Sequence, residues 1–326
     1  MKSILVTGAT GLVGSNLCPL AVEQGYRVHA LVRSQADTGP LLAAGAQLVQ
    51  GDVTDPASLD RAMLGMDFVI HCAAQIGGSW SKATPQDFEQ INQRGSINVL
   101  AAAERSGIQR TVMLLTPVLF DRSETLTENS RLAPIGPQHS PYTRTKLAAF
   151  YEGMARAARG QEIVFSIPGG IYGPAPIVER AIVPTSFNGT LLMALRGELK
   201  RFLGNPSNWA LATDVARISL LALEKGVRGA RYLACGHPAD DLSLPEFCNR
   251  ALEIAGKPNR VSTFNPAPAG PEEMAEFGTM LKYLQPSYPK PMVDCSLTTA
   301  ALGFAPTPLG EGLRQTLAWL KAAGKL

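Results

Sequence analysis

The sequence predicts an α/β protein built on a doubly wound parallel sheet, with a smaller, discontinuous C-terminal lobe. Two patterns support this prediction. Short apolar runs alternate with segments of helical periodicity up to residue 167, and stretches rich in proline and glycine replace that rhythm after Pro168. The chain has 326 residues, of which 45% are hydrophobic and 17% charged, so it is long enough to bury a sizeable core.

The first predicted unit is a strand, a tight turn and a helix. Ser3 to Thr7 is a short apolar run that ends at Gly8, and the stretch from Leu12 to Gln24 has helical spacing and is closed by Gly25. The same order then repeats. We expect further strands at residues 27–32, 46–50, 67–71, 110–116 and 162–167. Predicted helices lie between them at residues 40–44, 56–64, 85–106 and 140–159. Strands that alternate with helices pair in parallel, and ligands of such sheets bind beyond the carboxyl ends of the strands.

Composition and charge exclude several classes of protein. The net charge is +3, and Lys and Arg are spread along the chain without runs, which argues against a nucleic-acid partner. The 5 cysteines are widely spaced and form no CxxC pair, so neither a disulfide framework nor a metal site is indicated. No signal peptide or membrane span is indicated either. We therefore expect a cytoplasmic protein that acts on a small-molecule substrate.

Three glycines stand at the turn between the first strand and the first helix, in "TGATGLVG". Gly8, Gly11 and Gly14 allow the backbone to bend tightly and approach a pyrophosphate, whose charge then meets the helix N-terminus. A plain strand-to-helix turn is the alternative. The strand, helix and second strand around the motif favour dinucleotide binding in a Rossmann-type sheet.

The chain is expected to return to this sheet in its C-terminal half, because residues 213–224 have helical spacing and residues 231–235 read as a strand. We therefore expect a dinucleotide-binding domain formed by residues 1–167 plus about 205–236. The substrate-binding lobe is then formed by about 168–204 and 237–326.

Polar and small residues follow the neighbouring strands. Asp52 is placed where a carboxylate accepts a hydrogen bond from an adenine amino group, although it also suits a cap of the next turn. Ala73 and Ala74 leave room for a ribose and pyrophosphate, with loop packing as the alternative. We interpret His71 as a hydrogen-bonded histidine at a strand end. Asn92 is either a surface residue or a partner of the backbone after the fourth strand.

A hydroxyl, a phenol and an ammonium group form the candidate catalytic set. Ser140 and Pro141 predict a helix start, which puts Tyr142 in the first turn and Lys146 four residues later on the same face. A nearby ammonium favours the phenolate of a tyrosine, whose pKa is ordinarily about 10. Thr116, at the end of the fifth strand, is suited to hold a substrate oxygen beside Tyr142 while hydride moves. Singly, each residue also fits an ordinary structural position.

The end of the second strand predicts the cofactor. NAD-binding turns place an acid about 20 residues after the glycine motif, where it would repel a 2′-phosphate. Here Val32 is followed by Arg33 and Ser34, a guanidinium and a hydroxyl that suit a phosphate, and Asp37 lies too far along to replace the acid. We therefore expect NADP in preference to NAD, with a solvated loop arginine as the alternative.

The chain resembles the extended short-chain dehydrogenase/reductase family over nearly its whole length. The resemblance lies in "TGATGLVG", "GDVTD", "HCAA", "YTRTK", "IPGGIYGP", "TDVARISLLALE" and "AALGFAPTPLGEGLRQTLAWL", and is greatest to the dihydroflavonol-reductase-like branch, which also contains hopanoid-associated sugar epimerases. It implies a bound nicotinamide cofactor, a Thr116, Tyr142, Lys146 triad, and Pro168 to Ile171 near the nicotinamide. It also suggests a homodimer. With the strand ends, the expected cofactor-binding set is Gly8, Thr10, Gly11, Leu12, Val13, Arg33, Asp52, Val53, Ala73, Ala74, Tyr142, Lys146, Pro168 and Ile171.

One departure concerns the fifth strand. The family shows two or three small hydroxyl residues there, whereas this chain has "LLTP", in which Pro117 lacks an N–H donor and favours an extended Thr116.

Three functions are weighed. The first is a reductase or dehydrogenase of a small carbonyl or alcohol, for which Trp80, Tyr172, Phe187 and Trp209 suggest an apolar pocket unless they are plain core. The second is an epimerase of nucleoside-diphosphate sugars that retains its cofactor. Its phosphates need cations, which Arg180, Arg196, Lys200 and Arg201 would provide unless they are solvated helix charges. The third is a cofactor-sensing protein without catalysis.

Overall fold

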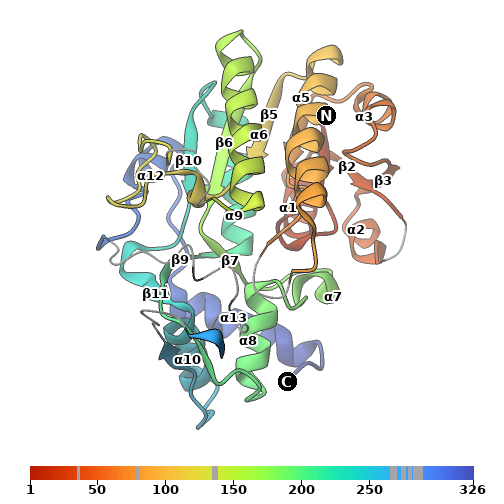
Figure 1. The fold of residues 1–326 in the computed structure, drawn as a ribbon. Helices are drawn as coiled ribbons and strands as arrows, with labels where there is room; N and C mark the ends of the chain where they lie inside the picture. The colour runs from red at the N-terminus through yellow and green to blue at the C-terminus, as the bar shows by residue number, and fades with distance from the viewer. Residues whose placement is uncertain are drawn as a thin grey trace.

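The computed structural model describes residues 1–34, 37–77, 81–133, 139–264, 270–272, 277, 281 and 289–326. Figure 1 shows one large sheet wrapped by helices in the upper part of the molecule and a smaller lobe below it. Among the described residues, every helix is too short or too polar to cross a membrane.

The large sheet has seven strands in the order β10-β6-β5-β4-β1-β2-β3, and each neighbouring pair is parallel. Its strands are β1 Ser3–Thr7, β2 Arg27–Val32, β3 Gln47–Gln50, β4 Phe68–His71, β5 Arg110–Leu114, β6 Ile163–Pro168 and β10 Arg231–Ala234. This order reverses direction between β1 and β4, so their carboxyl ends open the crevice in which doubly wound sheets bind ligands. The prediction of the fold class is confirmed.

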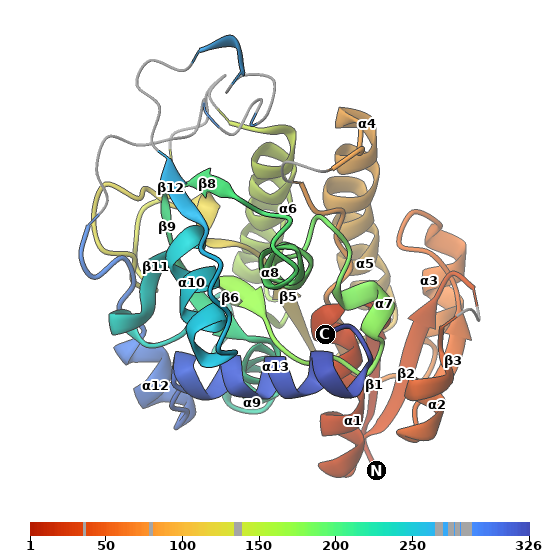
Figure 2. The ribbon, with the colours of Figure 1, turned by 90° about the horizontal axis from the view of Figure 1, so that it is seen from below.

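Helices cover both faces of the sheet. They are α1 Leu12–Glu23, α2 Gly39–Ala43, α3 Pro56–Met63, α4 Pro85–Phe88, α5 Gly95–Arg105, α6 Pro141–Ala158, α9 Ala212–Lys225 and α12 Ser296–Leu302. Figure 2 shows α5 and α6 on one side of the sheet and α1 and α9 on the other.

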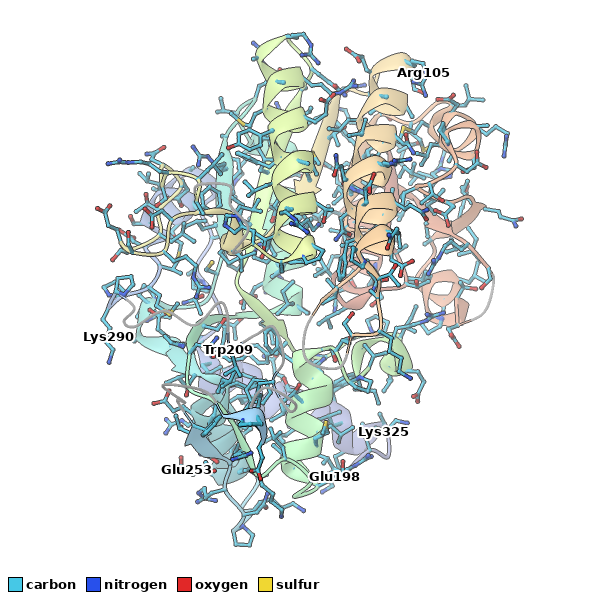
Figure 3. The ribbon with its side chains drawn as sticks, in the orientation of Figure 1. Arg105, Glu198, Trp209, Glu253, Lys290 and Lys325 are labelled. Carbon is cyan, nitrogen blue, oxygen red and sulfur yellow. The ribbon has the colours of Figure 1, made fainter. Side chains whose placement is uncertain are left out.

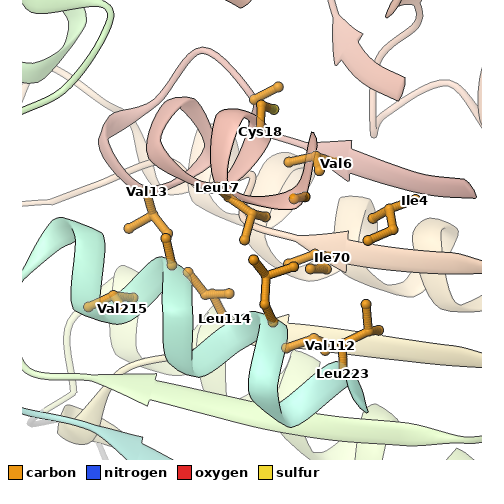
Figure 4. Close-up of a cluster of buried hydrophobic side chains, with 14 of the residues drawn as sticks. Ile4, Val6, Val13, Leu17, Cys18, Ile70, Val112, Leu114, Val215 and Leu223 are labelled. Carbon is orange, nitrogen blue, oxygen red and sulfur yellow. The ribbon is translucent and has the colours of Figure 1, made fainter. Parts of the chain in front are cut away.

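Both faces of the sheet carry apolar side chains, because successive residues of a strand point to opposite faces. Ile4 and Val6 point to the α1 and α9 side, where they meet Leu17 and Leu223 (Figure 4), whereas Leu5 packs toward α3 and α5. All of these side chains are fully or almost fully buried. Both faces are therefore apolar, as buried parallel strands require.

Two features beside the crevice differ from the prediction, one inside a helix whose ends were predicted correctly to within one residue and one at a strand end. The helix expected at residues 85–106 is interrupted by a π-helical turn, Glu89–Arg94, between α4 and α5. The strand expected to reach Thr116 ends at Leu114, because Pro117 starts a 3₁₀ turn, Pro117–Leu119. Thr116 keeps an extended backbone, with φ −159° and ψ 147°, as its position before proline predicts.

The lower lobe is built around two small sheets. One has the order β11-β9-β7 and the other β12-β8. The strands are β7 Gly170–Tyr172, β8 Arg201–Leu203, β9 Pro206–Leu211, β11 Asp241–Ser243 and β12 Ser262–Phe264. The helices are α7 Val178–Ala181, α8 Phe187–Leu195, α10 Leu244–Ile254 and α13 Leu309–Ala322.

The chain crosses between the two parts more than once. β9 belongs to a lobe sheet, whereas α9 and β10, which follow it, pack on the large sheet, so the predicted return to that sheet is confirmed. Trp209, labelled in Figure 3, lies in the lobe and stacks on Phe247 with ring centroids 3.9 Å apart. Trp209 and Tyr172 are both buried in the lobe core, in line with the plainer interpretation of these aromatic residues. Trp80 lies outside the described residues.

Candidate active site

The turn after β1 forms a tight cradle. Gly8 has φ +67°, and a Cβ at this position would lie 2.6 Å from the backbone nitrogen of Ala73. A Cβ at Gly14 would collide with the carbonyl oxygen of Gly8, and the amide of Gly11 closes the turn by donating to that oxygen at 3.0 Å. Both Gly8 and Gly14 are therefore required by close approach of main chain to main chain.

The N-terminus of α1 faces this turn without a side-chain cap. Gly11 is the N-cap residue, and the first turn carries no acidic side chain. The first amides of a helix have no acceptors within the helix, so those of Leu12 and Val13 are available to an anion. The side chain of Val13 belongs to the core, and this residue can contribute only its backbone. Cradle and helix start together fit a dinucleotide pyrophosphate.

The segment after β4 is held against the cradle by buried polar side chains. The amide of Ala73 donates to Thr7 Oγ1 at 3.4 Å, Thr7 Oγ1 lies 2.7 Å from His71 Nδ1, and His71 Nε2 lies 2.9 Å from Ser96 Oγ. The prediction of a hydrogen-bonded histidine is confirmed. Ala74 follows Ala73 with a partly buried side chain.

Asn92 lies fully buried in the π-helical turn and clamps the same segment further on. Its Oδ1 accepts the amide of Gln75 at 2.8 Å and its Nδ2 donates to the carbonyl of Gln75 at 3.0 Å. Of the two alternatives for Asn92, the backbone partner is therefore the one realised. π-Helical turns often occur at functional sites. Here the turn places the side-chain amide of Asn92 against the backbone of Gln75, in the segment that follows β4.

The loops after β2 and β3 carry the residues that the sequence predicted for the adenosine half of a dinucleotide. Asp52 Oδ1 accepts the amide and the hydroxyl of Thr54, each at 2.8 Å, so this carboxylate does cap the following turn. The side chain of Val53 belongs to the core. Arg33 and Ser34 follow β2 with exposed side chains, and Asp37 forms an ion pair with Arg180 of α7 at 3.6 Å.

Thr116 and Tyr142 are brought together beyond β5. Ser140 caps α6 by accepting the amide of Thr143 at 3.1 Å, and Pro141 is the first helical residue, as predicted. Tyr142 is thereby set in the first turn, where the Thr116 side chain acts on its phenol and lowers its pKa. The ring of Phe88 packs edge-on against Tyr142, with centroids 6.2 Å apart.

Lys146 lies one turn further along α6 and is buried. Its Nζ donates to the carbonyl of Leu114 at 3.2 Å, and its charge acts on His71 and Cys72 at the end of β4. The Lys146 side chain therefore crosses the crevice between the ends of β5 and β4. Burial lowers the pKa of Lys146 to about 8.

The electrostatics of Tyr142 differ from the expectation. Burial raises its pKa to about 12 and outweighs the hydrogen bond from Thr116, which acts in the opposite direction. The Lys146 ammonium donates its hydrogen bond to the backbone carbonyl of Leu114. Tyr142 is consequently a neutral phenol near pH 7. In this form it can donate a proton, and it can accept one only after it has done so.

A cavity lies beyond the end of β5. It begins with Pro117 and Val118, directly after Thr116, and includes Gly169, directly after Pro168. Apolar walls come from Leu126, Met292 and Val293, among others, and polar groups from Arg122, Glu124, Ser207 and Asn208. Its described lining does not include Thr116, Tyr142 or Lys146, but it does include the residues that directly follow Thr116 and Pro168, and such a position suits a substrate site.

The sequence profile of the NAD dependent epimerase/dehydratase family matches residues 4–235, well over half of the chain. The chain belongs to this family. It is therefore an enzyme of the oxidoreductase type that works with a nicotinamide dinucleotide, and the predicted resemblance is confirmed.

Named relatives cover nearly the whole chain. It is 26% identical to a sterol demethylase protein B from Methylococcus capsulatus, over 99% of each protein. It is 28% identical to a putative dihydroflavonol 4-reductase from Synechocystis, over 98% of this chain and 94% of the relative. In fold it is similar to a UDP-glucuronic acid 4-epimerase from Bacillus cereus solved with UDP-glucuronic acid and NAD. The TM-score is 0.76, with 20% identity over 98% of this chain and 99% of the other.

Several residues of this family member's site escaped the sequence analysis. The cavity residues near 122–126 and 289–293 are far apart in sequence and belong to no local motif. Thr7 ends the first predicted strand and Ser96 lies within the helix predicted at residues 85–106, and no function was predicted for either side chain. Their signal is a polar residue on a buried face, which is informative only when its partner is known.

Proposed function

We propose that this protein is an NADP-dependent reductase or dehydrogenase that interconverts a carbonyl and an alcohol on a small, largely apolar molecule. Two observations carry the proposal. The Thr116 side chain acts on the phenol of Tyr142 and lowers its pKa, and a cavity with mostly apolar walls begins at Pro117 and Val118, directly after Thr116. Burial of catalytic groups with shifted pKa values next to such a cavity is typical of active sites.

In the direction of reduction, Tyr142 donates its phenolic proton to the substrate oxygen, and Thr116 holds that oxygen in place. The cradle of Gly8, Gly11 and Gly14 would hold the dinucleotide, which would supply the hydride to the carbonyl carbon, so that the C=O group would become CH–OH. Proton transfer turns Tyr142 into a phenolate. Lys146, one turn further along α6, keeps its positive charge in the crevice on the Leu114 carbonyl, and a positive charge there favours the phenolate. In the direction of oxidation the same groups act in reverse.

The charges around the cavity favour this reductase over an epimerase of nucleoside-diphosphate sugars. Among its described lining residues, Arg122 is balanced by Glu124, whereas a diphosphate calls for an excess of cations. The four cations considered for that purpose are absent from the described lining. Arg180 pairs with Asp37, Arg196 donates to the carbonyl of Lys325, and Arg201 lies over the ring of Phe264. Lys200 is exposed.

The proposal is tested by turnover and by what remains bound after purification. We expect exchangeable NADPH to be consumed with a panel of apolar ketones and aldehydes, and to be re-formed from NADP with the matching alcohols. A tightly held dinucleotide together with a sugar nucleotide, and no turnover with the panel, would support the epimerase instead. A bound dinucleotide with neither activity would support a sensing protein.

The preference for NADP rests on Arg33 and Ser34, which stand exposed after β2 where an acid would otherwise reject a 2′-phosphate. The NAD bound to the Bacillus cereus protein shows the cofactor of that protein and does not decide the preference of this chain. In titrations we expect the parent to bind NADPH more tightly than NADH. Arg33→Ala should weaken NADPH by about 1–3 kcal/mol, the scale of a hydrogen bond to a charged group, and leave NADH almost unchanged. A parent preference for NADH, or equal losses, would contradict this assignment.

A further inference from the structure

The polar groups behind the cradle form a single chain. It runs from the amide of Ala73 through Thr7, His71 and Ser96 to the main-chain carbonyl of Asn92. All of these side chains are at most 1% exposed, so water does not compete for their hydrogen bonds. This hydrogen-bonded series therefore connects the end of β1, the end of β4 and the π-helical turn, and only its contact with the Ala73 amide is partly buried instead of buried.

The direction of every hydrogen bond in this chain follows from its last member. A carbonyl oxygen only accepts, so the bond of 2.7 Å between Ser96 Oγ and the Asn92 carbonyl uses the one hydroxyl proton of Ser96. Ser96 must then accept from His71, which puts a proton on Nε2. His71 Nδ1 is left as an acceptor and receives the hydroxyl proton of Thr7. Thr7 Oγ1 in turn accepts the amide of Ala73.

We propose that His71 is a positioning residue of the dinucleotide site. As the neutral Nε2–H tautomer it joins Thr7 to Ser96 and so fixes the segment after β4 against the glycine cradle. The contact that matters is the one between Gly8 and Ala73, where a single added Cβ would lie 2.6 Å from the Ala73 nitrogen. Asn92 holds the same segment two residues later, at Gln75, through both of its amide atoms.

The surroundings of His71 keep it neutral. Burial and the neighbouring charge of Lys146 lower its pKa to about 3, so the imidazole carries one proton throughout the neutral range. A second proton would sit on Nδ1 and remove the acceptor of Thr7. The catalytic lysine thus supports the tautomer that orders the cofactor turn. This inference rests on the dinucleotide site of the proposed function and requires nothing of the substrate.

The test uses the full chain and titrates NADPH and NADH, because either dinucleotide reports on the cradle. Thr7→Val keeps the shape of the strand residue and removes the hydroxyl. We expect it to weaken both dinucleotides roughly tenfold, the effect of losing one buried hydrogen bond, while turnover at saturating dinucleotide stays near the parent value. Ser96→Ala should weaken both by a smaller factor. His71→Asn, whose amide oxygen can replace Nδ1, should bind more tightly than His71→Leu.

Two variants serve as matched controls. Thr111→Val makes the same change in β5 at a position that is 1% exposed. Ser219→Ala removes a buried hydroxyl that contacts Ser166 Oγ and the Val215 carbonyl on the other face of the sheet. Both should bind dinucleotide like the parent. Equal affinities for Thr7→Val and Thr111→Val would overturn the proposal.

Nitrogen NMR of the histidine rings provides a second readout. A purely structural role of His71 would not require any particular tautomer. One of the 4 histidines should show an Nε2–H tautomer that stays neutral well below pH 6, and its signals should vanish in His71→Asn. An Nδ1–H tautomer, or an imidazolium at pH 7, would also overturn the proposal. Failure of the substrate panel would leave these affinities and signals unchanged, so the two proposals fail separately.

Discussion

The cradle at the end of β1 takes its shape from main-chain geometry, whereas the cavity beyond Thr116 takes its shape from side chains of distant segments. In the cradle, Gly8, Gly14 and Ala73 leave no room for a further carbon atom. The cavity walls come from residues near 117–126, 169 and 289–293 and from residues 207–208 of β9. A cradle of this kind tolerates little change, while a wall of side chains can be rebuilt for another substrate without moving the fold.

The largest expected effect separates the two regions functionally. Tyr142→Phe removes the proton donor and leaves the cradle intact, so turnover should fall by about 10²–10⁴ while dinucleotide affinity stays nearly unchanged. Steady-state kinetics and dinucleotide titration on the same sample measure both quantities. Full activity in this variant would break the assignment of Tyr142, and a parallel loss of affinity would show that the two regions are not separable.

The next effect tests whether the cradle is limited by contact or by backbone conformation. Gly8→Ala should lower the free energy of unfolding by about 2–4 kcal/mol, because it adds a clash with Ala73 to the cost of a positive φ. Gly25→Ala is the matched control. Gly25 has φ +84° and nothing within 4 Å of its Cβ position, so only the conformational cost, about 1 kcal/mol, should appear.

Denaturant unfolding of both glycine variants measures the difference, and dinucleotide binding should be lost only in Gly8→Ala. Equal destabilisation of the two variants would mean that the close approach to Ala73 contributes nothing.

This contrast also explains what the sequence could reveal. The glycine turn, the alternation of strands and helices and the Ser140–Pro141 helix start were predictable, because each depends on local spacing and backbone chemistry. The π-helical turn was not, because Asn92 is drawn inward by a backbone partner 17 residues away. Nor was the raised pKa of Tyr142, since the amount of burial at a residue depends on what packs around it, here Phe88 and the segment before Gly77.

A smaller effect concerns the residue where the two regions meet. Thr116→Ala removes the hydroxyl that bonds Tyr142, so we expect turnover to fall about tenfold to a hundredfold, whereas Thr116→Ser should cost much less. Thr116→Val is the control for shape and should resemble Thr116→Ala. The pH dependence of turnover sharpens the result, because loss of a hydrogen bond that lowers the pKa of Tyr142 should move its basic limb to higher pH. Parent-like rates in all three variants would make Thr116 a structural residue.

The smallest expected effect is an increase in the free energy of unfolding of Lys146→Met, a variant that should lose turnover. Lys146 has a pKa lowered from 10.5 to about 8 by burial, so at pH 7 the folded protein carries a buried charge that the unfolded chain keeps in water. Lys146→Met should therefore lose turnover and weaken dinucleotide binding, yet raise the free energy of unfolding at pH 7 by on the order of 1 kcal/mol. The gain is limited because the Leu114 carbonyl loses its donor.

The sign of the pH dependence distinguishes this origin from a simple packing effect. Between pH 8 and 10.5 the folded protein has released the Lys146 proton while the unfolded chain still holds it, so the parent gains stability as pH rises through this window. The buried cysteines act in the opposite direction above pH 9, because their folded pKa values are raised, but they are common to both proteins. The difference in unfolding free energy between Lys146→Met and the parent should consequently shrink from pH 8 to 10.5. A difference that is constant with pH would show that the Lys146 ammonium is not desolvated in the folded state, and that the crevice between β4 and β5 is wetter than its geometry indicates.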